Sequence, residues 1–448
     1  MLRSSNLPRR AKHLLWIAGL FVAACTPVVD DGAGWRILDG APQTIYRQGV
    51  PHTDAQGRPR NGFDPDTSFF PVGIYHGLTG TFGGIEYGFA PLAAAGFNTV
   101  IGNGLLKSTD MIDAARAAGV QVVISNPDDD AVRLAAGHPN VLAFDVDHEP
   151  SYDLPGPAAN ARVDRFRARR VAIRDIDPDR AVFVVDSPTI SAPHLDLWQT
   201  WKRMGDVASF FSYPVTDYSM ATLDVRESVG PVTSRAVDAV GAQKPVWFVA
   251  QAFESRSFGW LMPDERQARS MAYTGLVHGA TGIIWFSFDS FVTRNGLVTG
   301  IGPDLRSEYE IVRPGGLTGA TPFTANREVI RRSKALWRTV VALNREITAL
   351  RDVWLSPTAA IDHVVEVRGM ARSDTPVRTM LKAVGSGLVL VMVSVDDAPL
   401  EFRVRLDDQV LAIDRLAGDA RAAARGGQVV GEIDGFGTAV LKLTVAAR

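Results

Sequence analysis

The sequence predicts an α/β protein in which a (β/α)8 barrel is followed by a C-terminal antiparallel β-sandwich. Eight apolar, strand-like runs alternate with helical segments between about residues 69 and 350. From about residue 353 the helical period disappears, and short apolar runs are separated by turn residues such as Gly385-Ser-Gly387. The first texture is typical of barrels built from βα units and the second of sandwiches. An open doubly wound sheet is the alternative, but the sequence lacks a Gly-rich phosphate turn of the G-x-G-x-x-G or P-loop type.

The barrel strands are expected where β-branched and aromatic residues cluster. They are 69–75, 97–101, 120–124, 141–150, 181–185, 207–213, 246–249 and 282–286. Helices are expected between them, where apolar residues recur at helical spacing; Asp110 and Gly119, for example, mark the start and end of the second helix. The helices are 85–96, 109–119, 129–136, 158–176, 195–204, part of 221–240, 264–278 and 326–350.

The sandwich strands are expected at six short runs, namely 358–361, 363–368, 379–382, 388–394, 400–406 and 439–444. The chain then divides into a leader (1–25), a tether or N-terminal extension (26–67), a barrel (68–350) and a sandwich (351–448). A chain of 448 residues exceeds what one hydrophobic core usually supports, which agrees with two domains. The segment 290–322 is long for a connection in this fold and is a candidate lid.

Composition is that of an ordinary globular protein, with 46% hydrophobic and 21% charged residues. The net charge is -2, and the sequence shows neither a basic stripe nor a zinc-type Cys/His spacing. We therefore expect no nucleic-acid partner.

The N-terminus predicts an exported lipoprotein. Four basic residues within the first 12 positions precede the apolar run 14–24, which has the length of a signal-peptide core and is short for a membrane span. The run ends in Val22-Ala-Ala-Cys25, which resembles the lipobox of bacterial lipoproteins, and Cys25 is the only cysteine of the chain. The resemblance implies lipidation of Cys25, a membrane anchor and a periplasmic, outer-membrane or surface-facing place in the cell envelope. A plain secretory signal with an incidental cysteine is the alternative.

The stretch 141–150 carries the strongest functional signal. Alternate side chains of an extended strand share a face, so Asp145, Asp147 and Glu149 are expected to line one face of an apolar strand. Burial of ionised groups without partners is unfavourable, and catalysis is one reason to retain them. The alternative is structural: an edge strand with a hydrated face, or buried carboxylates that accept hydrogen bonds.

Catalytic groups of a (β/α)8 barrel lie at the C-terminal ends of its strands. Here those ends are rich in carboxylates, amides and aromatic residues, which suits a carbohydrate ligand. The residues expected to contact the substrate are Tyr75, Asn103, Asp186, Tyr213, Gln251, Trp285 and Asp289. Trp285 is included because its phase partners Ser287 and Asp289 are polar, which indicates a series facing the barrel interior. The residues at these ends include neither a metal-ligand cluster nor the Lys, Arg and Gly residues of a phosphate-binding site, so no cofactor is expected.

From about residue 69 to 350 the chain resembles the large TIM-barrel clan of glycoside hydrolases. The motifs that carry the resemblance are His148-Glu-Pro150, Tyr213-Pro214, Gln251-Ala-Phe253 and the segment 278–283 before Trp285. In that clan the Glu that ends strand four is the general acid/base, so the resemblance implies this role for Glu149. The clan's nucleophile closes strand seven, where this chain has Gln251, an amide. Glu254, three residues later, is the candidate replacement.

The series Asp145-x-Asp147-x-Glu149, together with Tyr213 and Trp285, also resembles family 18 chitinases. That resemblance implies that the substrate's acetamido group acts as the nucleophile while Glu149 protonates the leaving oxygen and Asp147 steadies the oxazolinium. Leu142 stands where that family has a further Asp.

Both catalytic routes stay open on the sequence. It predicts an exported glycoside hydrolase that cleaves a poly- or oligosaccharide. The rival is a glycan-binding lipoprotein that has kept the barrel and lost catalysis, a reading motivated by Gln251.

Overall fold

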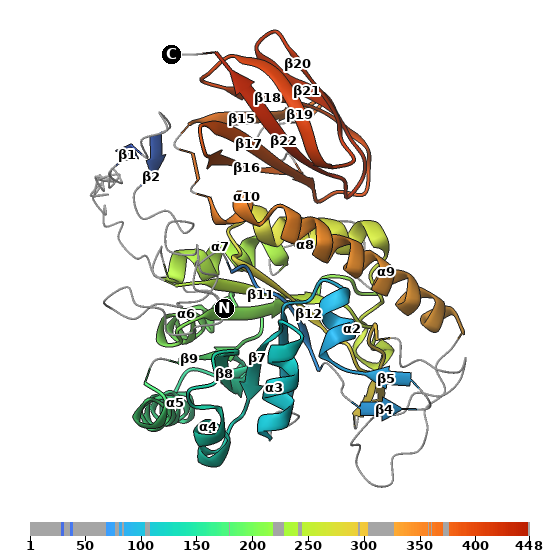
Figure 1. Cartoon of the computed structure of the whole chain (residues 1–448). Helices are drawn as coiled ribbons and strands as arrows, with labels where there is room; N and C mark the ends of the chain where they lie inside the picture. Colours follow the sequence, from blue (N-terminus) through green and yellow to red (C-terminus); the bar gives the residue numbers. More distant parts are fainter. Residues whose placement is uncertain are drawn as a thin grey trace, which may run out of the picture.

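The predicted barrel is confirmed by the computed structural model (Figure 1). The structure describes residues 28–30, 36–38, 69–76, 80–82, 85–103, 108–178, 180–217, 228–240, 244–293, 296–302, 327–356, 358–359, 361–370 and 376–446. Eight parallel strands close in the order β10-β11-β12-β3-β6-β7-β8-β9. They are β3 (Val72–Tyr75), β6 (Thr99–Asn103), β7 (Gln121–Ser125), β8 (Val141–His148), β9 (Ala181–Val185), β10 (Ala208–Ser212), β11 (Val246–Gln251) and β12 (Gly282–Phe286).

Helices surround the barrel, and each carries an apolar stripe towards the strands. They are α2 (Phe89–Ala94), α3 (Thr109–Ala117), α4 (Asp129–Ala135), α5 (Pro157–Ile176), α6 (Leu195–Met204), α7 (Val229–Val240), α8 (Glu265–Val277) and α9 (Arg327–Ala349), followed by α10 (Arg351–Leu355). The starts of two of them are capped by aspartate: the Asp128 side chain accepts from the Ala131 amide at α4, and at α8 the Asp264 side chain accepts from the Gln267 amide while the Gln267 side chain accepts from the Asp264 amide. Among the described residues, none of the helices is long and apolar enough to cross a membrane.

The first predicted helix, 85–96, is wrong in its first part. Residues Ile85–Tyr87 form β5, which pairs with β4 (Gly80–Phe82), and α2 starts only at Phe89. Ile85 and Tyr87 have high strand propensity. Gly88 has low helix propensity, so the helix starts only after it.

Two apolar layers position the strand ends. Phe183, Trp247 and Ile284 fill the barrel interior. Phe144, Phe210 and Phe248 alternate with them and pack between the strands and the helices. Full burial of one such side chain stabilises the fold by about 1.5–3 kcal/mol relative to exposure. The alternation decides which residue at each strand end faces the barrel mouth and which faces a helix.

The C-terminal sandwich is confirmed, with two four-stranded sheets in the orders β15-β18-β21-β20 and β16-β17-β22-β19. The strands are β15 (His363–Val367), β16 (Val377–Val384), β17 (Gly387–Ser394), β18 (Leu400–Leu406), β19 (Val410–Gly418), β20 (Arg421–Arg425), β21 (Gln428–Ile433) and β22 (Thr438–Val445). The sequence prediction missed β19, β20 and β21. Much of β19 and β20 is solvent-accessible, and their apolar residues occur in unbroken runs such as 410–413 and 422–424 and do not alternate with polar ones, so the period-two signal is weak there.

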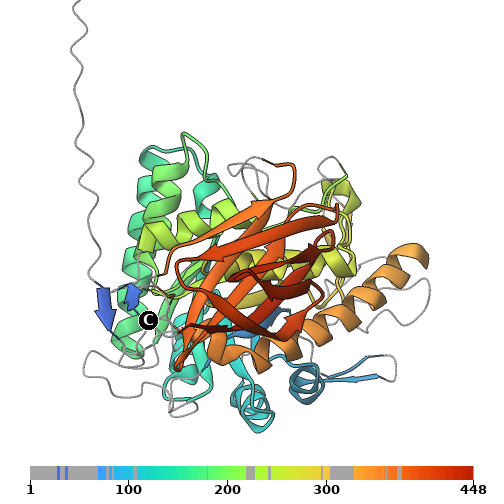
Figure 2. The same ribbon diagram turned by 90° about the horizontal axis from the view of Figure 1, so that it is seen from above.

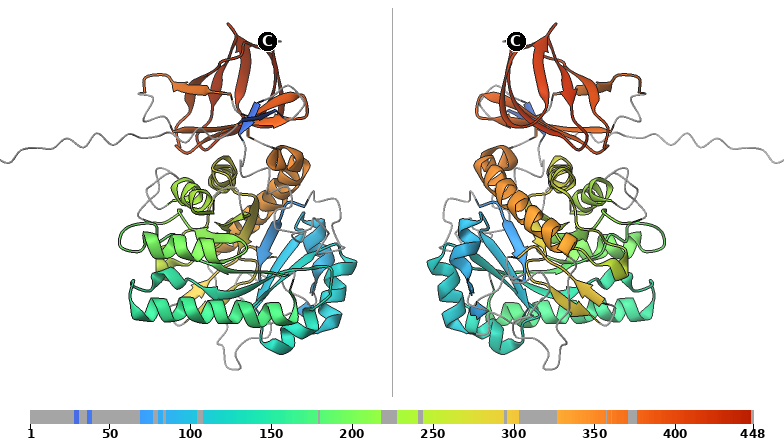
Figure 3. Two further views of the ribbon diagram at one scale, coloured as in Figure 1. Left: turned by 90° about the vertical axis from the view of Figure 1, so that its left-hand side faces the viewer. Right: turned by 90° about the vertical axis from the view of Figure 1, so that its right-hand side faces the viewer.

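The sheet β16-β17-β22-β19 packs against α8, as the red strands stacked on the helices show (Figures 2 and 3). Two polar contacts fix this interface: Ser270 Oγ donates to the Ser394 carbonyl oxygen at 2.7 Å, and Arg269 Nε donates to Thr438 Oγ1 at 2.8 Å. The sandwich is therefore bound to the helical layer of the barrel.

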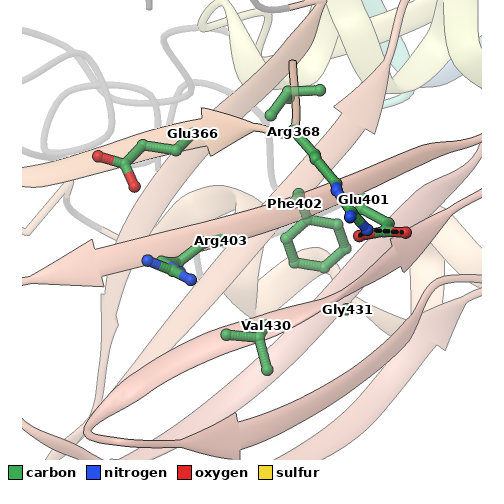
Figure 4. A pocket seen from close by; sticks show the side chains of 8 residues that line it. Glu366, Arg368, Glu401, Phe402, Arg403, Val430 and Gly431 are labelled. Atoms are coloured by element: carbon green, nitrogen blue, oxygen red, sulfur yellow. Dashed lines mark hydrogen bonds and ion pairs between the residues drawn. The ribbon is translucent and has the colours of Figure 1, made fainter. Parts of the chain in front are cut away.

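The other sandwich sheet has a shallow hollow on the face opposite the sandwich core (Figure 4). Its volume is about 520 Å³, and it is bordered by the exposed ion pair between Arg368 and Glu401, whose closest atoms lie 2.8 Å apart. Arg403 and Val430 also line it, whereas Phe402 beside them belongs to the core.

Two short hairpins complete the described part of the chain: β1 (Val28–Asp30) with β2 (Arg36–Leu38), and β13 (Phe291–Thr293) with β14 (Gly296–Val298). The second lies at the start of the candidate lid; positions 294–295 and 303–322 of that segment are outside the described residues. Cys25 and the predicted leader are outside them as well.

Candidate active site

The end of β8 does not line up its three acids on one face, so that expectation is wrong. Pairing of β8 with β9 shifts register between Asp145 and His148. Asp145 is fully buried and faces the interior, where the Tyr75 hydroxyl donates to its Oδ2 at 3.4 Å. Asp147 instead meets α5 on the outside of the barrel. The irregular pairing separates residues that a regular strand would place together.

Asp145 is a buried carboxyl that forms no ion pair with an arginine of the described residues. Burial raises its pKa to about 6, although the nearby His148 partly opposes this. His148 Nε2 lies 3.5 Å from Asp145 Oδ2. Asp145 Oδ1 has no hydrogen-bond partner among the described residues. This carboxyl therefore retains a proton more readily than an ordinary aspartate.

Glu149 follows β8 and is exposed to solvent. Its backbone is in the left-handed region, with φ of 53° and ψ of 42°, and its amide donates to the Val185 carbonyl oxygen at 3.0 Å. Partial desolvation raises the pKa of its carboxyl; the positive charges of His148 and Arg162 oppose that shift, and the charge of Asp186 adds to it. Glu149 thus combines access to solvent with a carboxyl that keeps its proton to higher pH than an ordinary glutamate does.

Asp147 is held by Arg162 of α5. The guanidinium donates twice to the carboxylate, from Nε to Oδ2 at 2.8 Å and from an Nη to Oδ1 at 2.7 Å. The same oxygen Oδ1 also accepts from the His148 amide at 2.9 Å. The two-point pair with Arg162 directs the Asp147 carboxylate at a surface helix. The carboxylate is therefore not placed to stabilise a positive charge at the C-terminal end of the barrel. This geometry contradicts the oxazolinium role predicted for Asp147.

Asp186, after β9, is fully buried and occupied by protein groups. Its Oδ1 accepts from the Ser151 hydroxyl at 2.7 Å and from the Ser187 amide at 3.0 Å. Its Oδ2 lies 3.6 Å from Nζ of the equally buried Lys202. Burial raises the pKa of Asp186, and burial lowers the pKa of Lys202 to about 8. The substrate contact predicted for Asp186 is contradicted, because its carboxylate is inside the protein.

Gln251 has the predicted interior phase, but its amide is not available to a substrate. Oε1 accepts from the Val215 amide at 2.9 Å, and Nε2 donates to the carbonyl oxygens of Val215 at 3.0 Å and Leu261 at 2.9 Å. These contacts use both amide hydrogens of a fully buried side chain. Gln251 therefore joins two loops at the barrel end, and its predicted role in substrate binding is wrong.

Glu254 is 3% exposed and lies between two arginines. Its Oε1 accepts from Arg256 Nε at 2.7 Å, and its Oε2 accepts from an Nη of Arg332, on α9, at 2.6 Å. The Met262 amide adds a third donor at 3.3 Å. Each oxygen accepts from a guanidinium group inside the protein, which favours a structural role; the role of Glu254 as nucleophile or base stays a prediction.

Tyr213, just after β10, is half-buried in a group of aromatic rings. Its ring stacks on Phe211 with centroids 4.7 Å apart and meets the edges of Phe253 at 4.9 Å and Trp260 at 5.6 Å. Burial raises the pKa of its hydroxyl well above the usual range, and the charge of Glu149 raises it further. Tyr213 and Glu149 therefore share one site, and an aromatic wall stands beside the exposed carboxyl.

Trp285 lies in the layer between the barrel and its helices, so the expectation that it faces the interior is wrong. It is fully buried, and its indole Nε1 donates to Asn344 Oδ1 of α9 at 3.0 Å. The neighbouring Phe286 takes the interior position instead and stacks on Tyr213 with centroids 5.9 Å apart. The prediction for Trp285 extends the alternation of Ser287 and Asp289 back into β12. That alternation is one residue out of phase with the strand.

Three other predicted residues end neighbouring strands. Tyr75 is in the interior beside Asp145. Asp289 is buried, with Oδ1 3.0 Å from Nδ1 of His76, so a histidine already occupies part of its carboxylate. Asn103 is the last residue of β6, but its side chain is outside the described part of the structure.

Sequence reasoning missed Arg162, Phe286 and Tyr152. Tyr152 is 57% exposed, its amide donates to the Glu149 carbonyl oxygen at 3.2 Å, and repulsion between its phenolate and that of Tyr213 adds to the raised pKa of Tyr213. An aromatic residue three positions after Glu149 was the available signal. Among the described residues there is no group of three or more His, Cys, Asp or Glu placed to hold a metal ion.

Comparisons with known proteins leave the activity to be argued from the site. No protein-family model matches the chain, and no curated protein matches it. Similar solved structures include an alpha-amylase from H. orenii, with 10% identity, 84% of this chain and 100% of that chain covered, and a TM-score of 0.47. An isomaltulose synthase from Klebsiella sp. LX3 has 11% identity, coverage of 84% and 99%, and a TM-score of 0.47. At these values the likenesses carry no argument about what this chain binds or converts.

Proposed function

We propose that this protein is a glycoside hydrolase in which Glu149 protonates the leaving glycosidic oxygen. The observation that carries the proposal is the state of Glu149: among the carboxylates predicted at the strand ends, it is the exposed one, and its pKa is raised. A general acid needs both access to the substrate and a proton near neutral pH. The aromatic wall around Tyr213 offers ring faces against which a sugar can pack.

The second catalytic group is argued from the arginine pairs. An enzyme-supplied nucleophile or base must reach the anomeric carbon or its water with a free carboxylate. Glu254 and Asp147 are each held by an arginine, and Asp186 is buried. These contacts favour the substrate-assisted route, in which a 2-acetamido group of the sugar attacks and no free second carboxylate is required.

The test compares wild-type protein with Glu149→Gln on 4-methylumbelliferyl oligosaccharides. Pairs that differ only in a 2-acetamido or 2-hydroxyl group separate the routes. We expect turnover of acetamido substrates and a loss of roughly 10²- to 10⁴-fold in the variant, since an amide cannot donate the proton. Full activity of Glu149→Gln would remove Glu149 from the mechanism. Equal turnover of both members of each pair would contradict substrate assistance.

A non-catalytic glycan-binding protein is the second candidate. It is favoured by the same arginine contacts, because they leave neither Glu254 nor Asp147 free for catalysis. In that case a broad panel of soluble glycans would show saturable binding, measured by calorimetry, without release of reducing ends. Hydrolysis of any bound glycan by the wild-type protein, lost in Glu149→Gln, would exclude this candidate.

We also propose export and lipid anchoring through Cys25, on the strength of the leader and its Val22-Ala-Ala-Cys25 ending. Metabolic labelling with a fatty acid in a bacterial host tests this. The wild-type chain should take up label and fractionate with membranes, whereas Cys25→Ala should do neither. Label retained by Cys25→Ala would refute the assignment.

A further inference from the structure

We propose that Arg162 of α5 is a positioning residue, which clamps the segment 147–153 from outside the barrel and so holds the Glu149 carboxyl over the barrel mouth. The proposal rests on the proposed role of Glu149 as the acid. Arg162 lies 13 positions further along the chain and on a helix, and its contacts converge on both sides of Glu149.

The clamp consists of contacts before and after Glu149. On one side, Arg162 makes the two-point pair with Asp147 and donates from an Nη to the His148 carbonyl oxygen at 2.8 Å. On the other side, its second Nη donates to Asp153 Oδ2 at 3.2 Å. One rigid guanidinium plane therefore joins residues that flank Glu149, which a lysine with a single point charge cannot reproduce.

Glu149 needs such external support because of its backbone. A non-glycine residue with φ of 53° is in the left-handed region, which L-residues adopt only when their surroundings enforce it. The Glu149 amide is tied to β9 through Val185. The Arg162 contacts fix the adjoining residues, so the clamp and β9 together specify where the side chain points.

Arg162 also acts on Glu149 through its charge. The guanidinium lowers the pKa of Glu149, against the raising effect of partial desolvation. The paired carboxylates raise the pKa of Arg162 itself, so the charge is present throughout the working pH range. Position and charge are therefore two separable contributions of the same side chain.

Two substitutions separate these contributions. Arg162→Lys keeps the charge and loses the two-point clamp, so kcat should fall roughly 10- to 100-fold while the alkaline limb of the pH profile stays in place. Arg162→Met loses both, so kcat should fall similarly and the alkaline limb should move to higher pH, because Glu149 then holds its proton longer. Unchanged kcat in both variants, with an unmoved limb in Arg162→Met, would overturn the proposal.

Arg169 supplies the matched control on the same helix. It pairs with Asp129 and donates to the Pro127 carbonyl oxygen at 2.7 Å, and among the described residues its guanidinium makes no hydrogen bond or ion pair with the segment 147–153. Arg169→Met should change neither kcat nor the limb. An equal loss in Arg169→Met would assign the Arg162 effect to the stability of α5 and so contradict a positioning role.

A substrate-free readout separates failure of the clamp from failure of the proposed function. Carbon-13 NMR titration of the Glu149 carboxyl should give a higher pKa in Arg162→Met than in wild type, and the Tyr152 amide should exchange faster. Both changes in a protein that hydrolyses nothing would keep the clamp and refute the glycosidase. If the wild type is active but Arg162→Met changes neither the pKa of Glu149 nor the exchange rate of the Tyr152 amide, the clamp is refuted and the glycosidase is kept. If Arg162→Met does not fold, Asp153→Asn removes one arm of the clamp and should speed Tyr152 exchange.

Discussion

The ends of β8 and β11 both carry buried carboxyl groups, and the protein treats them in opposite ways. At β8, Asp145 is buried beside a tyrosine hydroxyl and a histidine, and its pKa is raised to about 6. After β11, Glu254 is buried between Arg256 and Arg332, and both of its oxygens accept from guanidinium groups. The first environment favours a proton, whereas the second holds the carboxyl between two guanidinium groups.

The difference shows which of the two strand ends is suited to acid chemistry. After β8, Glu149 is exposed, and partial desolvation raises the pKa of its carboxyl. Around β11 the Gln251 amide and the Glu254 ion pairs serve to join loops and α9. A strand end rich in polar residues is thus not by itself a catalytic end; the partners of each polar atom decide.

The largest expected effect concerns the buried proton of Asp145. Because its pKa of about 6 in the folded protein exceeds the ordinary value of 3.8, the folded state binds this proton more tightly than the unfolded state does. Its contribution to stability is therefore fully present below about pH 4 and is lost as pH rises through 6. The difference corresponds to about 3 kcal/mol.

Denaturant unfolding of wild type and Asp145→Asn between pH 4 and 7 measures this. The free energy of unfolding of wild type should fall with rising pH relative to the variant. Parallel pH dependence of the two proteins would mean that Asp145 is not an abnormal carboxyl, and the contrast with Glu254 would disappear.

A smaller effect is expected on the β11 side. Arg332→Met removes one of the two cations from a carboxylate that is 3% exposed, so the free energy of unfolding should fall by about 2 kcal/mol. The kcat per folded molecule should stay within about threefold of the wild-type value. Chemical denaturation and active-site-normalised assays measure the two quantities. A stable but inactive variant would show that the Glu254 ion pair belongs to the reaction.

The smallest effect concerns Trp285, which sets the layer between β12 and α9. Trp285→Phe keeps the packing of a large ring but leaves Asn344 Oδ1 without its indole donor. We expect a loss of about 1 kcal/mol in the free energy of unfolding and no change in KM. A raised KM with unchanged stability would restore Trp285 to the substrate site.

The sequence was sufficient for the barrel and most of its elements. Apolar runs such as Ala181–Val185 and Gly282–Phe286 lie between segments of helical period, and both appear in the structure with the predicted bounds. Local sequence determines these elements because period and capping act over a few residues.

The site was only partly predictable, because its geometry depends on long-range contacts. The Glu-Pro motif located Glu149. The irregular pairing after Asp145, however, places the side chains of Asp145 and Asp147 in different surroundings. Arg162 and Arg332 lie on helices, and nothing near them in the sequence says which strand-end carboxylate each one meets. The orientation of Trp285 failed for a related reason, since a phase taken from the residues after β12 does not continue into the strand.

The most direct test compares Glu149→Gln with Glu254→Gln on one acetamido-sugar substrate that the wild type hydrolyses. If the β8 end carries the chemistry, kcat/KM should fall at least roughly 100-fold in Glu149→Gln, while Glu254→Gln should keep kcat/KM near the wild-type value and lose stability instead. A Glu254→Gln variant that folds normally and is as inactive as Glu149→Gln would contradict the account.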